Sequence, residues 1–304
     1  MNDGPGIPFL LIRRARGAAL AGLLIAFLFG CRTDPSPLSR PFTMGVLSDI
    51  QYADKDPGGL RHYRSSLQRL EECVADLNAR KPDIVIQLGD IIDSGPESHL
   101  DAVLESFDRL TMPLYHVVGN HCLTIGREPL RRQLALQSFY YDFILPGAKG
   151  WRFVVLDGND GGYGVVGWPQ QEWFRATLKQ AVQKGERVIC FCHFPLIDGA
   201  APGARMADPQ PLLSAMDEAP CVVAWFAGHD HAGGYAIRKG VHHVTIKGMV
   251  EASQKNAYAL IELYPDGIRE RGIGEEPCRE MKWPVSPASA LPNPSAAVQG
   301  PPIP

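Results

Sequence analysis

The sequence is short of the features that mark several classes of protein. Its 30 Lys and Arg residues are outnumbered by 33 Asp and Glu residues. No Lys/Arg cluster is interleaved with aromatic residues, so a generally basic nucleic-acid binder is excluded. The seven cysteines among 304 residues form no dense disulfide framework, and we expect mostly free, buried thiols. A hydrophobic fraction of 45% is enough for a full core.

The N-terminal segment has no apolar run of the length that an ordinary membrane span needs. A basic cluster, Arg13–Arg16, precedes an uncharged run over 17–30, which is shorter than the roughly 20 residues of a membrane helix. This is typical of a signal peptide, and Leu28–Cys31 resembles a bacterial lipoprotein cleavage site. We predict a lipoprotein-type signal peptide over 1–31, lipid attachment to the membrane at Cys31, and export to the bacterial cell envelope. A plain signal peptide and an uncleaved anchor are the alternatives.

The remaining chain divides by composition into three parts. Residues 32–41 are rich in Pro and Ser and are predicted to be a linker. Residues 42–274 are predicted to form one domain. Residues 275–304 are rich in proline and lack periodicity, which indicates a disordered tail.

Five apolar runs in the domain end in side chains that bind metal ions. Each run is typical of a buried parallel strand, and ligands of open α/β sheets gather at the carboxyl ends of such strands. In chain order, these ends carry Asp49 and Gln51, Asp90, Asn120 and His121, His193, and His229 and His231. The pattern predicts a metal site at the rim of a β-sheet.

Helical patterns alternate with the first of these strands. Residues 60–80 and 100–107 have the apolar spacing of helices, so right-handed crossovers should give a parallel core. The Gly/Asn/Asp-rich segment 157–167 is predicted to be an active-site loop, and 194–207 a second loop. Residues 221–273 hold strand-like runs split by turn residues, which we interpret as an antiparallel meander.

Together, these blocks resemble the calcineurin-like metallophosphoesterases. The matching blocks are Asp49-x-Gln51, Gly89-Asp90, Gly119-Asn120-His121, His193 and Gly228-His229-Asp230-His231. Ser48–Asp54, Trp151–Asp157 and Gly240–Thr245 are also similar to one branch, the manganese-dependent ADP-ribose/CDP-alcohol diphosphatases. The resemblance implies an α/β fold, a four-layer αββα sandwich of two mixed sheets flanked by helices, with the metal site at the carboxyl-terminal rim of the strands.

The resemblance also implies two divalent metal ions that share Asp90. One ion would take Asp49, Gln51, Asp90 and His231, and the other Asp90, Asn120, His193 and His229. A shared carboxylate is what holds two such ions about 3.5–4 Å apart. Most of the wider family has His in place of Gln51, and a hard amide oxygen favours Mn²⁺. We therefore expect Mn²⁺, with Fe, Zn and Mg as alternatives.

Residues beside these blocks have supporting roles in this interpretation. The resemblance makes His121 the catalytic group, which protonates the leaving oxygen or stabilises charge on the phosphoryl group. We expect Asp230 to support the ligand histidines and Asp93 to cap a helix. Cys122 stands where the family commonly has Glu, which bears on the orientation of His121.

Other polar and aromatic residues are expected to have structural roles. We assign such roles to His116, His242 and His243. Asp157, Asn159 and Asp160 are expected to be solvated in their loop rather than to touch substrate. The aromatic residues that could stack on a nucleobase are expected to pack instead; they are Tyr52, Tyr141, Tyr163 and Trp168.

The leading hypothesis is a dinuclear metal-dependent phosphohydrolase. Its substrates would be small nucleoside diphosphate derivatives, ADP-ribose-like or CDP-alcohol-like, cleaved at the pyrophosphate. One alternative keeps the site and makes the chain a phosphodiesterase or phosphomonoesterase acting on cyclic nucleotides or phosphoproteins. An alternative of another class is an envelope binding protein with a decayed site, which metal analysis would distinguish from the enzymes.

Overall fold

The computed structural model describes residues 40–252 and 255–283. The signal peptide and lipidation predicted for 1–31, the linker up to residue 39, and residues 284–304 lie outside this range, and these remain predictions. Within the described part of the chain, no helix combines the length and the apolar character needed to cross a membrane.

Two mixed six-stranded sheets form the centre of the described structure. The first has the order β12-β11-β10-β1-β2-β3, and its strands are β1 (Phe42–Leu47), β2 (Ile84–Gln87), β3 (Leu114–His116), β10 (Ala257–Tyr264), β11 (Gly267–Gly274) and β12 (Arg279–Lys282). The second has the order β4-β5-β6-β7-β9-β8, and its strands are β4 (Tyr141–Phe143), β5 (Trp151–Val155), β6 (Arg187–Phe191), β7 (Val222–Ala227), β8 (Gly234–Arg238) and β9 (Val241–Thr245). The predicted parallel core is confirmed in both sheets, since β1-β2-β3 and β5-β6-β7-β9 are parallel.

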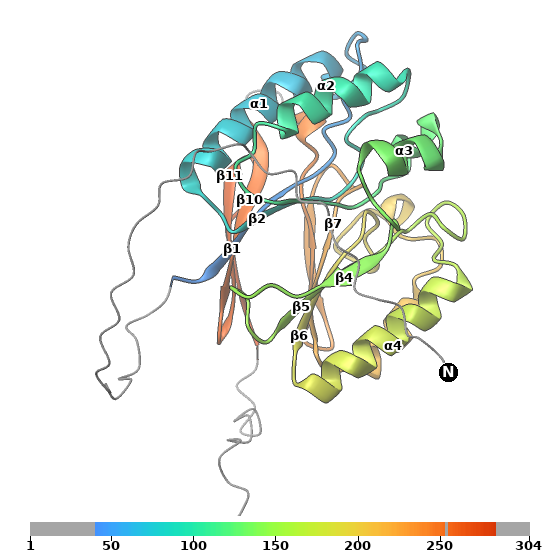
Figure 1. Ribbon diagram of the computed structural model, residues 1–304, viewed down its shortest axis with the longest axis vertical. Coiled ribbons are helices and arrows are strands. Elements are labelled where there is room, and N and C mark those ends of the chain that lie inside the picture. The colour runs from blue at the N-terminus through green and yellow to red at the C-terminus, as the bar shows by residue number, and fades with distance from the viewer. Residues whose placement is uncertain (1–39, 253–254, 284–304) are drawn as a thin grey trace, which may run out of the picture.

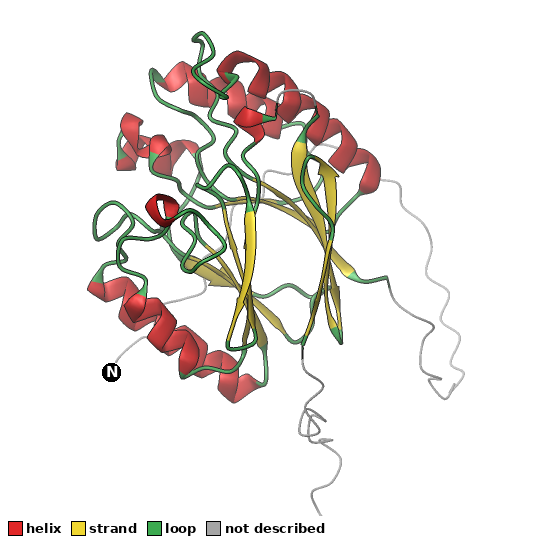
Figure 2. Ribbon diagram, turned by 180° about the vertical axis from the view of Figure 1, so that it is seen from behind, coloured by secondary structure: helices red, strands yellow, loops and turns green. Residues whose placement is uncertain are grey.

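Helices cover the outer face of each sheet. Figure 1 shows α1 (Tyr63–Arg80) and α2 (Glu97–Phe107) outside the first sheet and α4 (Trp168–Lys184) outside the second. The shorter helices are α3 (Arg127–Gln133), α5 (Gln210–Asp217) and the 3₁₀ turns η1 (His121–Ile125), η2 (Pro202–Ala204) and η3 (Met249–Glu251). Figure 2 shows helices on both outer sides, with loops gathered at one end of the sheets. The predicted four-layer α/β fold is confirmed.

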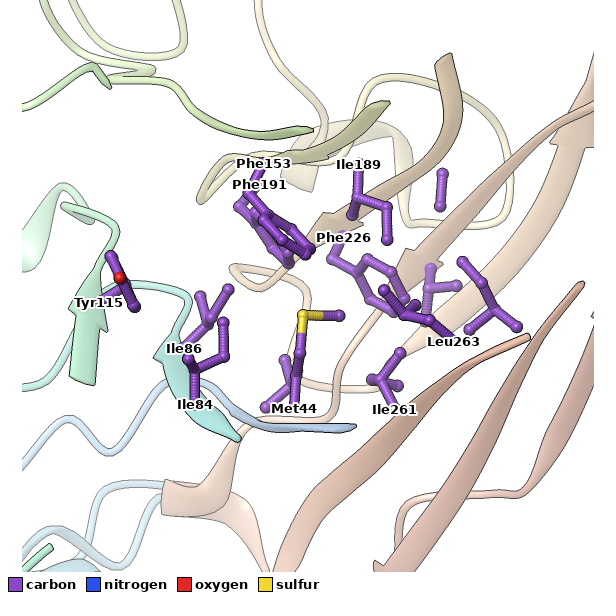
Figure 3. Packing of buried hydrophobic residues seen from close by; sticks show 14 of the residues in the cluster. Met44, Ile84, Ile86, Tyr115, Phe153, Ile189, Phe191, Phe226, Ile261 and Leu263 are labelled. Atoms are coloured by element: carbon purple, nitrogen blue, oxygen red, sulfur yellow. The ribbon is translucent and has the colours of Figure 1, made fainter. Parts of the chain in front are cut away.

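The main hydrophobic core lies between the two sheets. Met44 and Ile86 of the first sheet point toward Phe153, Phe191 and Phe226 of the second (Figure 3), and all five side chains are fully buried. The opposite faces of β1 and β2 pack against α1 and α2. Because these strands are buried on both faces, their sequences are almost continuously apolar.

The described cysteines are free, as predicted. Cys73, Cys122, Cys190 and Cys192 are buried, while Cys221 is half-buried and Cys278 is exposed. The buried thiols fill space in the cores that flank the sheets.

The prediction of one antiparallel meander over 221–273 is wrong. Strands β8 and β9 form a hairpin, but β9 then pairs in parallel with β7 in the second sheet. Strand β10 crosses to the first sheet, where it pairs antiparallel with β1 and with β11. Strand-like residue patterns identify a strand but do not select its partner. The β8–β9 and β10–β11 hairpins therefore look like one continuous meander in the sequence, although they belong to different sheets.

The predicted start of the disordered tail at residue 275 is also wrong. Strand β12 pairs antiparallel with β11 from Arg279 to Lys282, and Met281 is fully buried in the core between the sheets. The domain therefore continues to at least Lys282. A four-residue strand with one apolar side chain is too short to give a clear sequence pattern.

We predict that Met281→Ala destabilises the domain by about 2–5 kcal/mol, because it leaves a cavity in the inter-sheet core. Urea unfolding of the full chain measures the change, with exposed Lys282→Ala as the control. A disordered tail would instead give no difference between the two variants.

Candidate metal centre

Four of the predicted ligands have an unusual backbone conformation. Their φ angles are positive: Asp49 51°, Gln51 42°, Asp90 47° and His229 68°. A left-handed conformation costs a non-glycine residue roughly 1–2 kcal/mol, and such conformations are concentrated at functional sites. In each case the chain turns sharply just after a parallel strand, so the side chain leaves the strand direction.

The ends of neighbouring strands interlock through their backbones. The Gln51 N–H donates to the Asp90 carbonyl at 2.8 Å. A Cβ atom at Gly119 would collide with Asp90, and one at Gly228 would collide with Ser48 and Asp49. These two glycines therefore allow the close approach that brings the ligands of separate strands together.

One group of predicted ligands centres on Asp90. Ligand atoms of Asp90, His193 and His229 all lie within 4.8 Å of one another. His193 Nε2 lies 3.1 Å from Asp90 Oδ2 and 3.0 Å from His229 Nδ1. Asp90 and His193 are fully buried, so this group can enclose an ion from which most water is excluded.

A second group centres on Asp49. His231 Nε2 lies 3.3 Å from Asp49 Oδ1, and His231 Nδ1 lies 2.9 Å from Glu251 Oε1. The Gln51 amide donates weakly to Asp90 Oδ2 at 3.4 Å, which links the two groups. The sequence prediction thus named side chains that the fold brings to one place.

Three buried oxygens of this site lack a hydrogen-bond partner: Asp49 Oδ1, Gln51 Oε1 and Asn120 Oδ1. A buried polar atom without a partner normally costs about 1–3 kcal/mol, and each such atom in a native fold calls for an explanation. All three belong to predicted ligands, and carboxylate and amide oxygens with imidazole nitrogens are the ligand types that suit Mn²⁺ and related divalent ions. The residues therefore fit a pair of metal ions.

The buried charges are balanced by histidines when no metal is bound. Burial is the largest single effect on both carboxyls and favours their neutral forms. The charge and hydrogen bond of His193 together with the charge of His121 still lower the pKa of Asp90, and His231, His193 and Ser48 together lower the pKa of Asp49. Burial alone would lower the pKa of His193, yet Asp90 and Asp49 raise it to about 9. Burial and the neighbouring His193 lower the pKa of His229 to about 4. A metal ion at this site must therefore displace a proton from His193.

His121 lies beside the cluster at the start of η1. Its backbone N–H donates to Asp90 Oδ1 at 2.8 Å, and its ring Nδ1 donates to the Asp93 carbonyl at 2.6 Å. Because a carbonyl oxygen only accepts, Nδ1 must carry the proton, which leaves Nε2 for chemistry. Cys122 is buried in the core shared with α1 and α2. The residue that orients the His121 ring is therefore Asp93, through its backbone carbonyl.

The expected role of Asp93 as a helix cap is wrong. Helix α2 is preceded by Pro96, which makes no side-chain cap. The Asp93 carboxylate instead accepts from Lys55 at 2.5 Å and lies 3.5 Å from His121 Nδ1. The helix begins later than the local pattern indicated, so Asp93 remains at the site.

Asp230 does not support the ligand histidines as expected. Its carboxylate accepts from the backbone N–H groups of Ala201 and Ala232, so it fixes the loop after β6. Glu251 supports His231 instead. Glu251 lies 20 residues further along the chain, and the sequence around it carries no motif that would have identified it.

The loop 157–167 is present, but its first residues are not solvated as expected. Asp157 is fully buried and pairs with Arg127, and Asn159 is also buried. Of the aromatic candidates, Tyr141 donates to the His116 carbonyl at 3.0 Å and is structural as expected. Tyr163 differs, because it is 59% exposed and its hydroxyl lies 2.9 Å from His229 Nε2.

The fold and this ligand set define a class, the metal-dependent phosphoesterases. A family model described as calcineurin-like phosphoesterase matches residues 42–233. The chain belongs to this family, and it is a hydrolase of phosphoester-type bonds.

Individual relatives show which members of the family this chain is similar to. A manganese-dependent ADP-ribose/CDP-alcohol diphosphatase from Oryza sativa subsp. japonica is 30% identical over 75% of this chain and 89% of its own length. One from Bos taurus is 29% identical over 80% of this chain and 95% of its own length. The crystal structure of a dimetal phosphatase from Danio rerio is 25% identical, covers 81% of this chain and 100% of its own, and superposes with a TM-score of 0.72.

We predict that the metal-free protein loses stability as the pH rises from about 6.5 to 9. The folded state raises the pKa of His193 to about 9, so its stabilising proton is fully bound below the unfolded value near 6.5 and is lost as pH rises through 9. Urea unfolding in EDTA across this range measures the effect. The Mn²⁺-loaded protein is the control and should lack the decline, since metal takes the place of the proton.

Proposed function

We propose that this enzyme cleaves the pyrophosphate bond of nucleoside diphosphate derivatives with two divalent metal ions, preferably Mn²⁺. The observation that carries the proposal is the set of three buried oxygens that accept no hydrogen bond, Asp49 Oδ1, Gln51 Oε1 and Asn120 Oδ1, beside the Asp90–His193–His229 cluster. The naming of the diphosphatase relatives supports the substrate class.

The proposed ligand sets share one carboxylate. One ion is held by Asp49, Gln51, Asp90 and His231, and the other by Asp90, Asn120, His193 and His229. When bound, two such ions polarise the phosphoryl group and stabilise both the attacking and the leaving oxygen. Two carboxylates against two divalent cations leave an excess of positive charge, which suits a diphosphate.

Hydrolysis requires a proton at the leaving group. The oxygen of water bonds to one phosphorus, the bond from that phosphorus to the bridging oxygen breaks, and the departing phosphate oxygen takes a proton. We assign that proton to Nε2 of His121, since Nδ1 is committed to the Asp93 carbonyl. The Asp93 carboxylate, 3.5 Å from Nδ1, stabilises the protonated ring.

A second phosphate would meet further positive charge at the rim of the site. Arg61 is 3.8 Å from Glu251 Oε1 and 4.0 Å from Asp93 Oδ1, so it stands between the carboxylates that contact His231 and His121. These separations are too long for hydrogen bonds, and the guanidinium can donate to an anion. Arg61 is therefore placed where it could bind the second phosphate of a diphosphate substrate.

We predict that purified protein with Mn²⁺ releases AMP and ribose 5-phosphate from ADP-ribose, and CMP from a CDP-alcohol. Chromatography of the products measures both reactions, with cyclic nucleotides and a phosphomonoester as comparison substrates. Turnover of the comparison substrates alone would reject the diphosphate assignment and leave a metallophosphoesterase of another specificity.

We predict contrasting effects for two substitutions. Asp90→Ala should abolish turnover and lower the metal content, because both ions lose a ligand. His121→Ala should keep both ions while lowering kcat by roughly 10²–10⁴-fold, the typical contribution of a general acid. Elemental analysis and kinetics measure both, and equal metal loss in the two variants would show that His121 is a ligand.

A further inference from the structure

The three histidines of the proposed metal site each have a partner on the ring nitrogen that faces away from the cluster. His193 Nδ1 lies 2.9 Å from the Leu88 carbonyl, and His231 Nδ1 lies 2.9 Å from Glu251 Oε1. His229 Nε2 lies 2.9 Å from the Tyr163 hydroxyl. A histidine that binds a metal almost always donates its other N–H in this way, which fixes its tautomer.

For His229 the tautomer matters because of its neighbour. Its Nδ1 lies 3.0 Å from His193 Nε2. If both nitrogens present lone pairs to a cation, neither carries a proton, and each ring must be protonated at its far nitrogen. The Leu88 carbonyl can only accept, so it takes the N–H of His193. The Tyr163 hydroxyl can donate or accept, and it accepts from His229 when Nδ1 of that ring faces a cation.

Tyr163 reaches His229 from the loop between β5 and α4. Its ring packs edge-on against Phe194 and His229, at centroid distances of 5.3 and 5.9 Å. The loop is tied down by Asp160, which accepts from the Gly167 N–H at 2.6 Å. The ring contacts and the hydrogen bond within the loop together hold the hydroxyl at the imidazole. They do so although the residue is 59% exposed.

We propose that Tyr163 is a positioning residue that accepts the Nε2–H of His229 and so orients this ring with Nδ1 free to bind one of the two metal ions. The inference rests on the proposed dinuclear site. It makes Tyr163 specific to the ion held by His193 and His229, while Glu251 serves the ion held by His231. Loss of the Tyr163 hydroxyl should therefore weaken one ion and leave the other.

The test compares Mn²⁺ binding isotherms of the full chain carrying Tyr163→Phe or Tyr235→Phe with the wild type. Tyr235 is a matched control, since its hydroxyl lies 2.8 Å from His242 Nδ1, an imidazole outside the proposed ligand sets. Removing a residue that orients a metal ligand typically costs 10–100-fold in affinity. Because water can reach this exposed position, we expect about a tenfold weaker Kd for one of the two ions in Tyr163→Phe, and no change in Tyr235→Phe.

Further measurements separate a positioning role of Tyr163 from a merely structural one. The electron paramagnetic resonance signal of coupled Mn²⁺ pairs should require more metal to develop in Tyr163→Phe, and the Mn²⁺ concentration for half-maximal activity should rise while kcat at saturating metal is retained. Glu251→Gln should weaken the other ion. Thermal unfolding of the metal-free variants should match the wild type.

The possible results distinguish a failure of the proposed role of Tyr163 from a failure of the proposed dinuclear site. A wild-type isotherm with fewer than two Mn²⁺ ions per chain would overturn the dinuclear site, and the role of Tyr163 with it. Two ions in the wild type with unchanged binding in Tyr163→Phe would overturn the role of Tyr163 alone. Equal weakening of both ions would also overturn it, because the effect would not be specific to His229.

Discussion

Asp49 and Asp90 are two fully buried carboxylates at the ends of adjacent parallel strands, and the cost of burying both charges is the constraint around which the site is built. Burial, and to a smaller extent the charge of Asp49, would raise the pKa of Asp90, whereas His193 lowers it. The fold accepts two buried negative charges only because positive charge lies against them. In the metal-free chain protonated histidines supply that charge, and in the proposed enzyme the metal ions would supply it.

That balance depends on the packing of the two sheets. Asp49, Asp90 and Asn120 follow strands of the first sheet, whereas His193, His229 and His231 follow strands of the second. The two halves meet across the aromatic and aliphatic core of Figure 3. Because a packed core tolerates little displacement, the same contacts that hold the sheets together set the distances between carboxylates and imidazoles.

The sequence predicted those site residues that directly follow a strand. Apolar runs that end in Asp, Asn or His, three of them with glycine at the turn, predicted the parallel strands and the side chains that converge. Partners without such a signal were not predicted: Glu251 lies in the 3₁₀ turn η3, several residues beyond β9, and Tyr163 comes from an irregular loop. The strand pairing was not predicted for a similar reason, since β9 and β10 both have strand-like sequences but join different sheets. Local pattern defines what an element is, whereas its neighbour is chosen by the packing of the whole domain.

The hydrogen bonds around the histidines show that the contact between the two sheets also sets the orientation of the ligand atoms. The Leu88 carbonyl belongs to the turn after β2, yet it sets the tautomer of His193, which follows β6 in the other sheet. Asp90, two residues after Leu88, faces the opposite nitrogen of the same ring at 3.1 Å. One short segment therefore supplies the carboxylate proposed to be shared by both ions and also orients the ring proposed to bind beside it. A shift of this turn would disturb both at once, which gives a physical reason for the strained φ at Asp90 to persist.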